Sequence, residues 1–149
     1  EERGQAEAIA FNLREMSQIR VPIIVTITGE GGSGGALAIG VGDRVNMLEY
    51  SIYSVIAPES CSAILWRDQQ HAAEAAEALR LTPEDLKRFG LMDEIIAERE
   101  GEAHNDPTGM AKRLSAVLDG QLTELANTKP DHLLDLRYQK FRAMGVFGE

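Results

Sequence analysis

The N-terminal segment carries apolar side chains at helical spacing. Within residues 3–17 they recur every three or four positions, which predicts an amphipathic helix that needs a surface to lie on. These positions are Ala6, Ile9, Ala10, Leu13 and Met16. Pro22 prevents the helix from continuing. Residues 23–28 are an apolar, β-branched run without polar alternation, and such a run is typical of a strand covered on both faces, as in a parallel sheet.

Short strands and short helices alternate through the middle of the chain. The expected strands cover residues 45–48, 53–56 and 91–96, the last at a sheet edge. The expected helices cover residues 36–41, a stretch that begins at Pro58, residues 71–80 and residues 83–90. Thr82 has the side chain of an N-cap, and Gly90 is a fitting C-terminal residue for the helix that follows Thr82.

A polar stretch at residues 98–107 is the clearest boundary in the chain. We therefore expect a core over residues 1–100 and a helical extension over residues 101–149. Amphipathic helices are predicted in the extension over residues 110–125 and 131–144. The apolar stripe of the first is Leu114, Val117, Leu118, Leu122 and Leu125. In the second, the helix dipole favours cations near the C-terminus, and these are Arg137, Lys140 and Arg142.

The composition is that of a globular protein. The chain has 149 residues, 44% hydrophobic and 26% charged, which suits one domain and excludes a disordered or disulfide-rich chain. The net charge of −9 repels phosphate backbones, so no nucleic-acid partner is expected. No apolar run approaches the ~20 residues of a membrane span, and Cys61 is a single cysteine. We expect a soluble intracellular domain, and its start at Glu1 leaves open that it belongs to a longer chain.

A glycine-rich loop between the first strand and the next helix carries the candidate chemistry. Five of its seven residues are glycines, at Gly29, Gly31, Gly32, Gly34 and Gly35. Glycines at such a place can simply form a tight turn. So many of them also expose backbone N–H groups and let another molecule approach closely. The residues alone leave three chemical interpretations open.

The first interpretation is dinucleotide binding. Gly29, Gly31 and Gly34 satisfy the pattern G-x-G-x-x-G after a strand, and Glu49 lies 20 residues beyond Gly29. Against this interpretation, Gly40 and Gly42 interrupt the helix, which should be longer in such a fold.

The second interpretation is a nucleophilic serine. Ser33 occupies the centre of a G-x-S-x-G pattern between strand and helix. A triad would need a base from His71, His104 or His132, and the order Ser33, Asp106, His132 is allowed. Each histidine lies in a segment expected at the surface, and nothing else in the sequence supports the triad.

The third interpretation is an oxyanion hole made of backbone amides. Acyl chemistry that passes through an enolate needs donors aimed at the developing negative charge and no protein nucleophile. Gly31 and Gly32 could supply these N–H groups beside the positive end of a helix that begins near Ser33.

Residues 21–48 closely resemble one family. The segments 21–25, 29–43 and 45–48 are similar to the α subunit of bacterial and plastid acetyl-CoA carboxylase carboxyltransferase. The likeness extends to residues 1–10 and 53–66, continues through residues 91–96 and weakens after Gly101. Arg137, Tyr138 and Lys140 still resemble the family's tail.

The resemblance implies an α/β, crotonase-type fold, in which ββα units stack into two roughly perpendicular sheets. This chain would be the C-terminal portion of that fold, followed by additional helices. It implies transfer of a carboxyl group from carboxybiotin to acetyl-CoA, giving malonyl-CoA for fatty-acid biosynthesis. The implied partners are a β subunit in an α2β2 assembly, a biotin carboxyl carrier protein and biotin carboxylase, in an ATP-dependent complex. Zinc is expected on the β subunit only, since this sequence holds no Cys/His cluster. The implied location is the cytoplasm, or the plastid stroma in a plant.

The family's motif also assigns roles to single residues. The amides of Gly31 and Gly32 would stabilise the negative ureido oxygen of biotin. The residues expected to line the bound substrate are Gly29, Ser33, Gly34 and Gly35. We assign the Ser33 side chain to capping the following helix rather than to attack. Two alternatives stay open, a non-catalytic scaffold for assembly of the complex and a serine hydrolase that uses Ser33.

The family chain is substantially longer, and its N-terminal half has no counterpart here. We therefore expect the apolar face of the first helix and one sheet edge to be unpaired in this chain.

Overall fold

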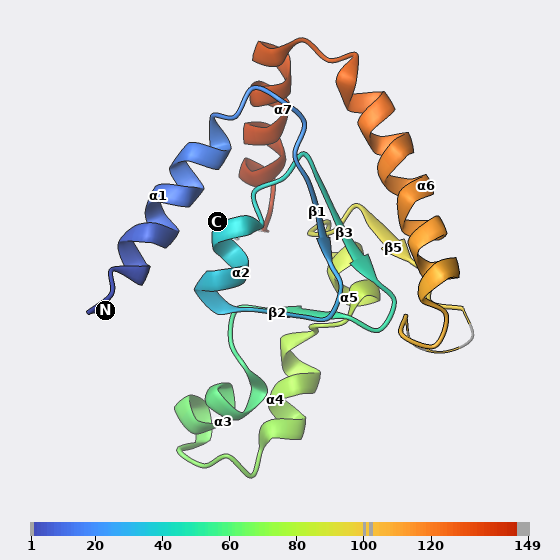
Figure 1. Cartoon of the computed structure of the whole chain (residues 1–149). Helices are drawn as coiled ribbons and strands as arrows, with labels where there is room; N and C mark the ends of the chain where they lie inside the picture. Colours follow the sequence, from blue (N-terminus) through green and yellow to red (C-terminus); the bar gives the residue numbers. More distant parts are fainter. Residues whose placement is uncertain (1, 100, 102, 146–149) are drawn as a thin grey trace.

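The computed structural model describes residues 2–99, 101 and 103–145. Its strands form two small parallel sheets (Figure 1). The first sheet has the order β1-β3-β5, with β1 at Ile24–Ile27, β3 at Arg44–Leu48 and β5 at Glu94–Ile96. The second pairs β2 at Glu30–Gly32 with β4 at Ile52–Ser54. The strands predicted near residues 23–28, 45–48, 53–56 and 91–96 are confirmed, the last at a sheet edge as expected.

Seven helices are present in the described residues. They are α1 at Gln5–Ser17, α2 at Ser33–Ile39, α3 at Pro58–Trp66, α4 at Ala72–Leu79, α5 at Pro83–Arg88, α6 at Pro107–Ala126 and α7 at Pro130–Arg142. The Thr82 side chain caps α5 by accepting from the Asp85 amide. Gly90 follows α5 with φ +73°, the left-handed conformation that ends helices and that glycine adopts without strain. The helix ends predicted here are therefore confirmed.

The chain repeats the order strand, strand, helix. β1, β2 and α2 form one unit, and β3, β4 and α3 form the next. In each unit the first strand joins the larger sheet and the second joins the smaller one, so that Val25 is paired with Val45 and Gly31 with Tyr53. This is the ββα arrangement that the family resemblance implied.

The core lies on both sides of β3. Its first cluster is Ile27, Val45, Met47, Leu86 and Met92. Its second is Leu48, Ile96 and Met110, against which α6 packs Leu114 and Val117. The division into a 1–100 core and a 101–149 extension stays a prediction, but these contacts show that α6 packs directly on the sheet.

The predicted stripe of α6 is wrong at one position. Leu122 is 45% exposed, whereas Gln121 beside it is buried. Asn46 donates from Nδ2 to the Gln121 Oε1 at 2.8 Å, and Gln121 donates from Nε2 to the Asn46 Oδ1 at 2.9 Å. An amide pair satisfied in this way can be buried without a large desolvation penalty, so α6 turns Gln121 toward β3.

The predicted role of Arg137 is also wrong. It lies before the last turn of α7, whose cations are Lys140 and Arg142, and its side chain is only 2% exposed. Its Nε and one terminal nitrogen donate to the two carboxylate oxygens of Asp43 at 2.9 and 2.8 Å. It also donates to the backbone oxygens of Met16, Ile19 and Val21. One side chain of α7 therefore ties the α1–β1 connection to the start of β3.

β1 is less covered than its apolar sequence predicts. Ile24, Val25 and Thr26 are only half-buried, because β1 lies at the opposite edge of the described sheet from β5 and pairs with β3 alone. α1 packs on α2 but has no fully buried residue, and Phe11 is 54% exposed. The expectation of one unpaired sheet edge and an incompletely covered first helix is confirmed for the described residues.

Candidate functional site

The glycine-rich segment is more ordered than the predicted loop. Glu30–Gly32 forms β2, and Ser33–Gly35 forms the first turn of α2. The Ile52 amide donates to the Gly29 oxygen at 3.0 Å, and β4 then continues alongside β2 in parallel register. The prediction of a loop at 29–35 was therefore wrong, because pairing with β4 extends the chain; the expected start of a helix at Ser33 is confirmed.

The strand directs its amides to two different edges. Alternate residues of a β-strand present their N–H and C=O groups to the same side. Since the Gly29 oxygen accepts from Ile52, Gly31 shares the edge that faces β4. Gly32 then presents its N–H group to the opposite edge, and its residue is exposed. Of the two predicted donors, Gly32 is the one with an open approach.

Ser33 does not cap α2, which corrects its predicted role. The N-cap is Gly32, in an extended conformation with φ −142° and ψ 149°, and no side chain caps the helix there. Ser33 is already inside the first turn, with φ +55°. A capping side chain belongs to the extended N-cap residue, from which it reaches the amides of the first turn, and Ser33 does not occupy that position. A non-glycine residue in the left-handed region is strained by ~1–2 kcal/mol.

A cavity of about 260 Å³ lies along the glycine-rich segment. Its lining includes residues 25–31, Ala36, Ile39 and Tyr53. Residues 32–35 are not part of this lining. Side chains added at Gly29 or Gly35 would meet no atom within 4 Å, so the backbone at these two positions is open to another molecule. Backbone amides, an open approach and the start of a helix together can stabilise a developing negative charge.

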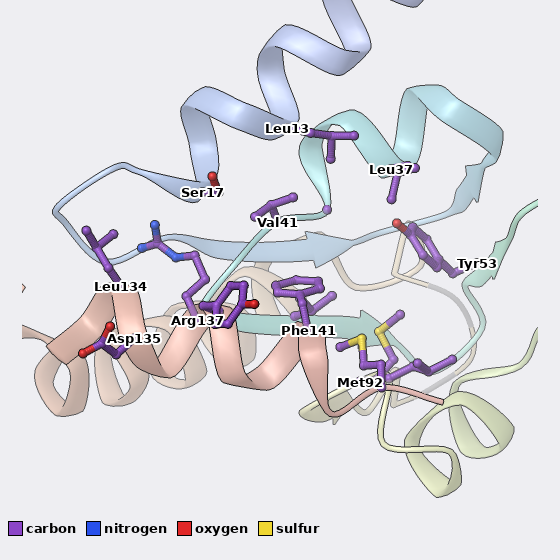
Figure 2. Close-up of a pocket in the computed structure, with 15 residues that line it drawn as sticks. Leu13, Ser17, Leu37, Val41, Tyr53, Met92, Leu134, Asp135, Arg137 and Phe141 are labelled. Carbon is purple, nitrogen blue, oxygen red and sulfur yellow. The ribbon is translucent and has the colours of Figure 1, made fainter. Parts of the chain in front are cut away.

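Tyr53, which the sequence reasoning missed, separates this cavity from a larger one. The larger cavity has a volume of about 620 Å³ and lies between α1, α2, α7 and the sheet (Figure 2). Leu13, Leu37 and Phe141 give it mostly apolar walls. Burial raises the pKa of the Tyr53 phenol above its ordinary value. The sequence placed Tyr53 at the start of a predicted strand, but only the pairing of that strand with β2 brings it onto Gly31.

The residues of the serine-hydrolase interpretation have other roles. The His71 ring stacks on Trp66 and lies 3.3 Å from the Glu74 carboxylate. The pKa of the Glu74 carboxyl is lowered mainly by a backbone hydrogen bond and, to a smaller extent, by its hydrogen bond with His71. Asp106 is the N-cap of α6 and accepts from the Gly109 amide at 2.9 Å.

The other two histidines are exposed. His104 lies before α6 and His132 lies in the first turn of α7. In the part of the chain that the structure describes, no hydrogen bond joins the Ser33 hydroxyl to His71 or His132.

The acidic residue of the dinucleotide interpretation is also engaged. Glu49 accepts from the Glu98 amide at 2.8 Å, and α2 is only seven residues long. In the described residues, no group of three or more His, Cys, Asp or Glu side chains could hold a metal ion. Over the same ranges, none of the helices has the length and apolarity needed to cross a bilayer.

Solved structures share this fold. The chain aligns with a Pseudomonas malonate decarboxylase hetero-tetramer in complex with coenzyme A at TM-score 0.71, with 18% identity, over 91% of this chain and 54% of the other. It aligns with transcarboxylase 12S at TM-score 0.59, with 19% identity, over 82% of this chain and 24% of that one. A probable enoyl-CoA hydratase from Mycobacterium thermoresistibile gives TM-score 0.58, with 18% identity, over 95% and 57%. These similarities show the crotonase-type fold.

The sequence relatives are far more similar. The acetyl-coenzyme A carboxylase carboxyl transferase subunit alpha of Geobacter metallireducens is 62% identical over 149 residues, which are 100% of this chain and 47% of the relative. That of Thermosynechococcus vestitus is 56% identical over the same residues and 46% of its own length. The chain thus spans about half the length of the curated relatives it matches. The family described as acetyl co-enzyme A carboxylase carboxyltransferase-like matches residues 1–145, and the chain belongs to this family.

Proposed function

We propose that this chain is the part of a carboxyltransferase α subunit that stabilises negative charge during transfer of a carboxyl group to acetyl-CoA. The observation that carries the proposal is the 62% identity to a carboxyl transferase subunit alpha over all 149 residues of this chain. The open β2–α2 junction supplies what enolate-forming acyl chemistry needs, since it offers backbone donors without a protein nucleophile.

The proposed donor is the amide of Gly32, which faces the open edge of β2. Gly31, the other donor expected from the family motif, lies on the edge that pairs with β4, so we assign it to holding the strand in place. A side chain added at Gly29 or Gly35 would meet no atom within 4 Å, and we propose that the biotin ring approaches the backbone at these open positions. When bound, carboxybiotin supplies the carboxyl group. Gly29, Ser33, Gly34 and Gly35 would border it with their backbone atoms.

The proposed partners follow from the family. They are a carboxyltransferase β subunit that carries zinc and holds acetyl-CoA in an α2β2 assembly, a biotin carboxyl carrier protein and biotin carboxylase. The assignment of zinc to the partner follows the family resemblance alone. The proposed location is the cytoplasm, or the plastid stroma in a plant.

The proposal is tested in the complete chain, assembled with its partner subunit. Gly32 is replaced by glycolic acid, which turns its amide into an ester and removes the N–H group. Proline is a poor substitute here, since it would force φ from −142° to about −65°. We expect kcat for carboxyl transfer to fall by ~10²–10³, the usual loss for one oxyanion donor. The same replacement at exposed Gly145 is the control.

Two results would redirect the proposal. If the Gly32 ester leaves carboxyl transfer unchanged in an assembled complex, the charge-stabilising role is wrong and the scaffold alternative stands. If the complex has no transfer activity but hydrolyses esters, and Ser33→Ala abolishes this, the hydrolase alternative stands.

A further inference from the structure

The aromatic ring of Tyr53 occupies the space that a side chain at Gly31 would need. Gly31 and Tyr53 are direct partners across the β2–β4 pair. A Cβ atom at Gly31 would lie 2.5 Å from Tyr53 Cδ2 and 3.1 Å from Tyr53 Cε2, far inside the roughly 3.5–4.0 Å at which carbon atoms pack. The ring therefore rests directly on the backbone of β2.

The same ring reaches the far end of α2. A Cβ atom at Gly40, the C-cap of α2, would lie 2.7 Å from the Tyr53 hydroxyl oxygen. Figure 2 shows the hydroxyl directed toward α2, next to Leu37. On the other side, the Tyr53 amide donates to the Leu81 oxygen at 3.2 Å, which connects β4 to the segment before α5. Tyr53 thus spans from β2 to the C-terminus of α2.

β2 needs such support because it has little of its own. It is three residues long, two of them glycines, and in the described structure it belongs to a two-stranded sheet. A two-stranded sheet is marginally stable, and glycine adds no side-chain packing. An aromatic residue placed opposite a glycine on the next strand restores the missing contacts.

We propose that Tyr53 is a positioning residue for the β2–α2 junction: its ring fixes the backbone of Gly31 and, through it, the direction of the neighbouring Gly32 amide. The inference rests on the proposed carboxyl-transfer function. It concerns placement alone, since the ring contacts Gly31 and not the open edge where Gly32 is exposed.

The test uses the complete chain assembled with its partner subunit. Tyr53→Leu removes the ring and should lower kcat by ~10²-fold, the loss that a 1 Å displacement of catalytic groups produces. The KM for acetyl-CoA should not change, because the proposed acetyl-CoA site lies on the partner. Tyr53→Phe keeps the ring and should rescue kcat to within a few-fold. Tyr50→Leu is the matched control, since Tyr50 is 58% exposed in the turn before β4.

A double variant checks the contact itself. Gly31→Ala alone should lower kcat at least as much as Tyr53→Leu, because its methyl group displaces either the ring or the strand. Gly31→Ala combined with Tyr53→Ala leaves room for the methyl group but still lacks the ring, so its kcat should be close to that of Tyr53→Ala alone instead of showing the product of the two losses.

The outcomes separate the inference from the function on which it rests. A wild-type complex that transfers no carboxyl group overturns the proposed function and the role of Tyr53 with it. An active wild type in which Tyr53→Leu changes only the unfolding temperature, with kcat intact, overturns the inference alone. The inference is also overturned if the loss of kcat in the double variant equals the product of the losses caused by Gly31→Ala and Tyr53→Ala separately.

Discussion

Removal of the Arg137 guanidinium should strongly destabilise the fold. In the structure Arg137 and Asp43 have side chains only 2% and 3% exposed, and they share two hydrogen bonds of 2.9 and 2.8 Å. Arg137→Met keeps the apolar stem but leaves the Asp43 carboxylate buried, with the Ile23 amide at 2.7 Å as a remaining donor. Loss of one partner from a buried pair costs about 3–5 kcal/mol, so we expect the free energy of unfolding to fall by that amount.

The assay is urea unfolding of the complete chain, followed by circular dichroism. Arg142→Met is the matched control, since Arg142 is exposed on the same helix and its removal should change the free energy of unfolding by less than about 0.5 kcal/mol. Arg137→Met combined with Asp43→Asn should recover part of the loss, because the uncompensated charge is gone. A loss below about 1 kcal/mol for Arg137→Met, or no recovery in the double variant, would refute the reasoning.

Three further predictions concern other contacts of the structure. Gln121→Leu leaves the buried Asn46 amide without its partner and should cost about 1–3 kcal/mol in the same urea assay, whereas Gln139→Leu at an exposed site of α7 should be nearly neutral. Burial raises the pKa of Tyr53, so its contribution to stability is complete below about pH 10 and declines above it, where the unfolded chain ionises first. As the pH rises past 10, the free energy of unfolding of the wild type should therefore fall relative to that of Tyr53→Phe. Curves of unfolding free energy against pH that stay parallel for the two proteins would contradict this. Ser33→Ala should keep most carboxyl-transfer activity, because Ser33 borders the site with its backbone; complete loss in a correctly assembled complex would point to the hydroxyl as a nucleophile.

The amino-acid sequence predicted the local elements well, because their signals are local. Proline and glycine mark the helix boundaries at Thr82–Gly90, and the β-branched run before Gly29 marks β1. The glycine pattern at 29–35 located the candidate site for the same reason. Its interpretation as a charge-stabilising junction came from resemblance to a family, since spacing alone left dinucleotide binding and a nucleophilic serine open.

The tertiary structure decided the features that depend on partners distant in the sequence. The sequence grouped Arg137 with the cations near the C-terminus of its helix, and periodicity placed Leu122 on the apolar stripe of α6. Both predictions were wrong. Arg137 is buried because Asp43, 94 positions away, neutralises it, and Gln121 is buried because Asn46, 75 positions away, completes its hydrogen bonds. Polar side chains are buried in a core only where a partner completes their hydrogen bonds. A local sequence pattern does not identify a partner that lies far away along the chain.

The glycine segment shows the same division within seven residues. Its glycine content predicted an unusual backbone. Pairing with β4 makes part of the expected loop a strand, and the N-cap of α2 is Gly32 instead of Ser33. The sequence by itself determined which residues are free of side chains. Only the tertiary structure decided which amide faces an open edge and which glycine lies under Tyr53, because both depend on a neighbouring strand about 20 residues further along the chain.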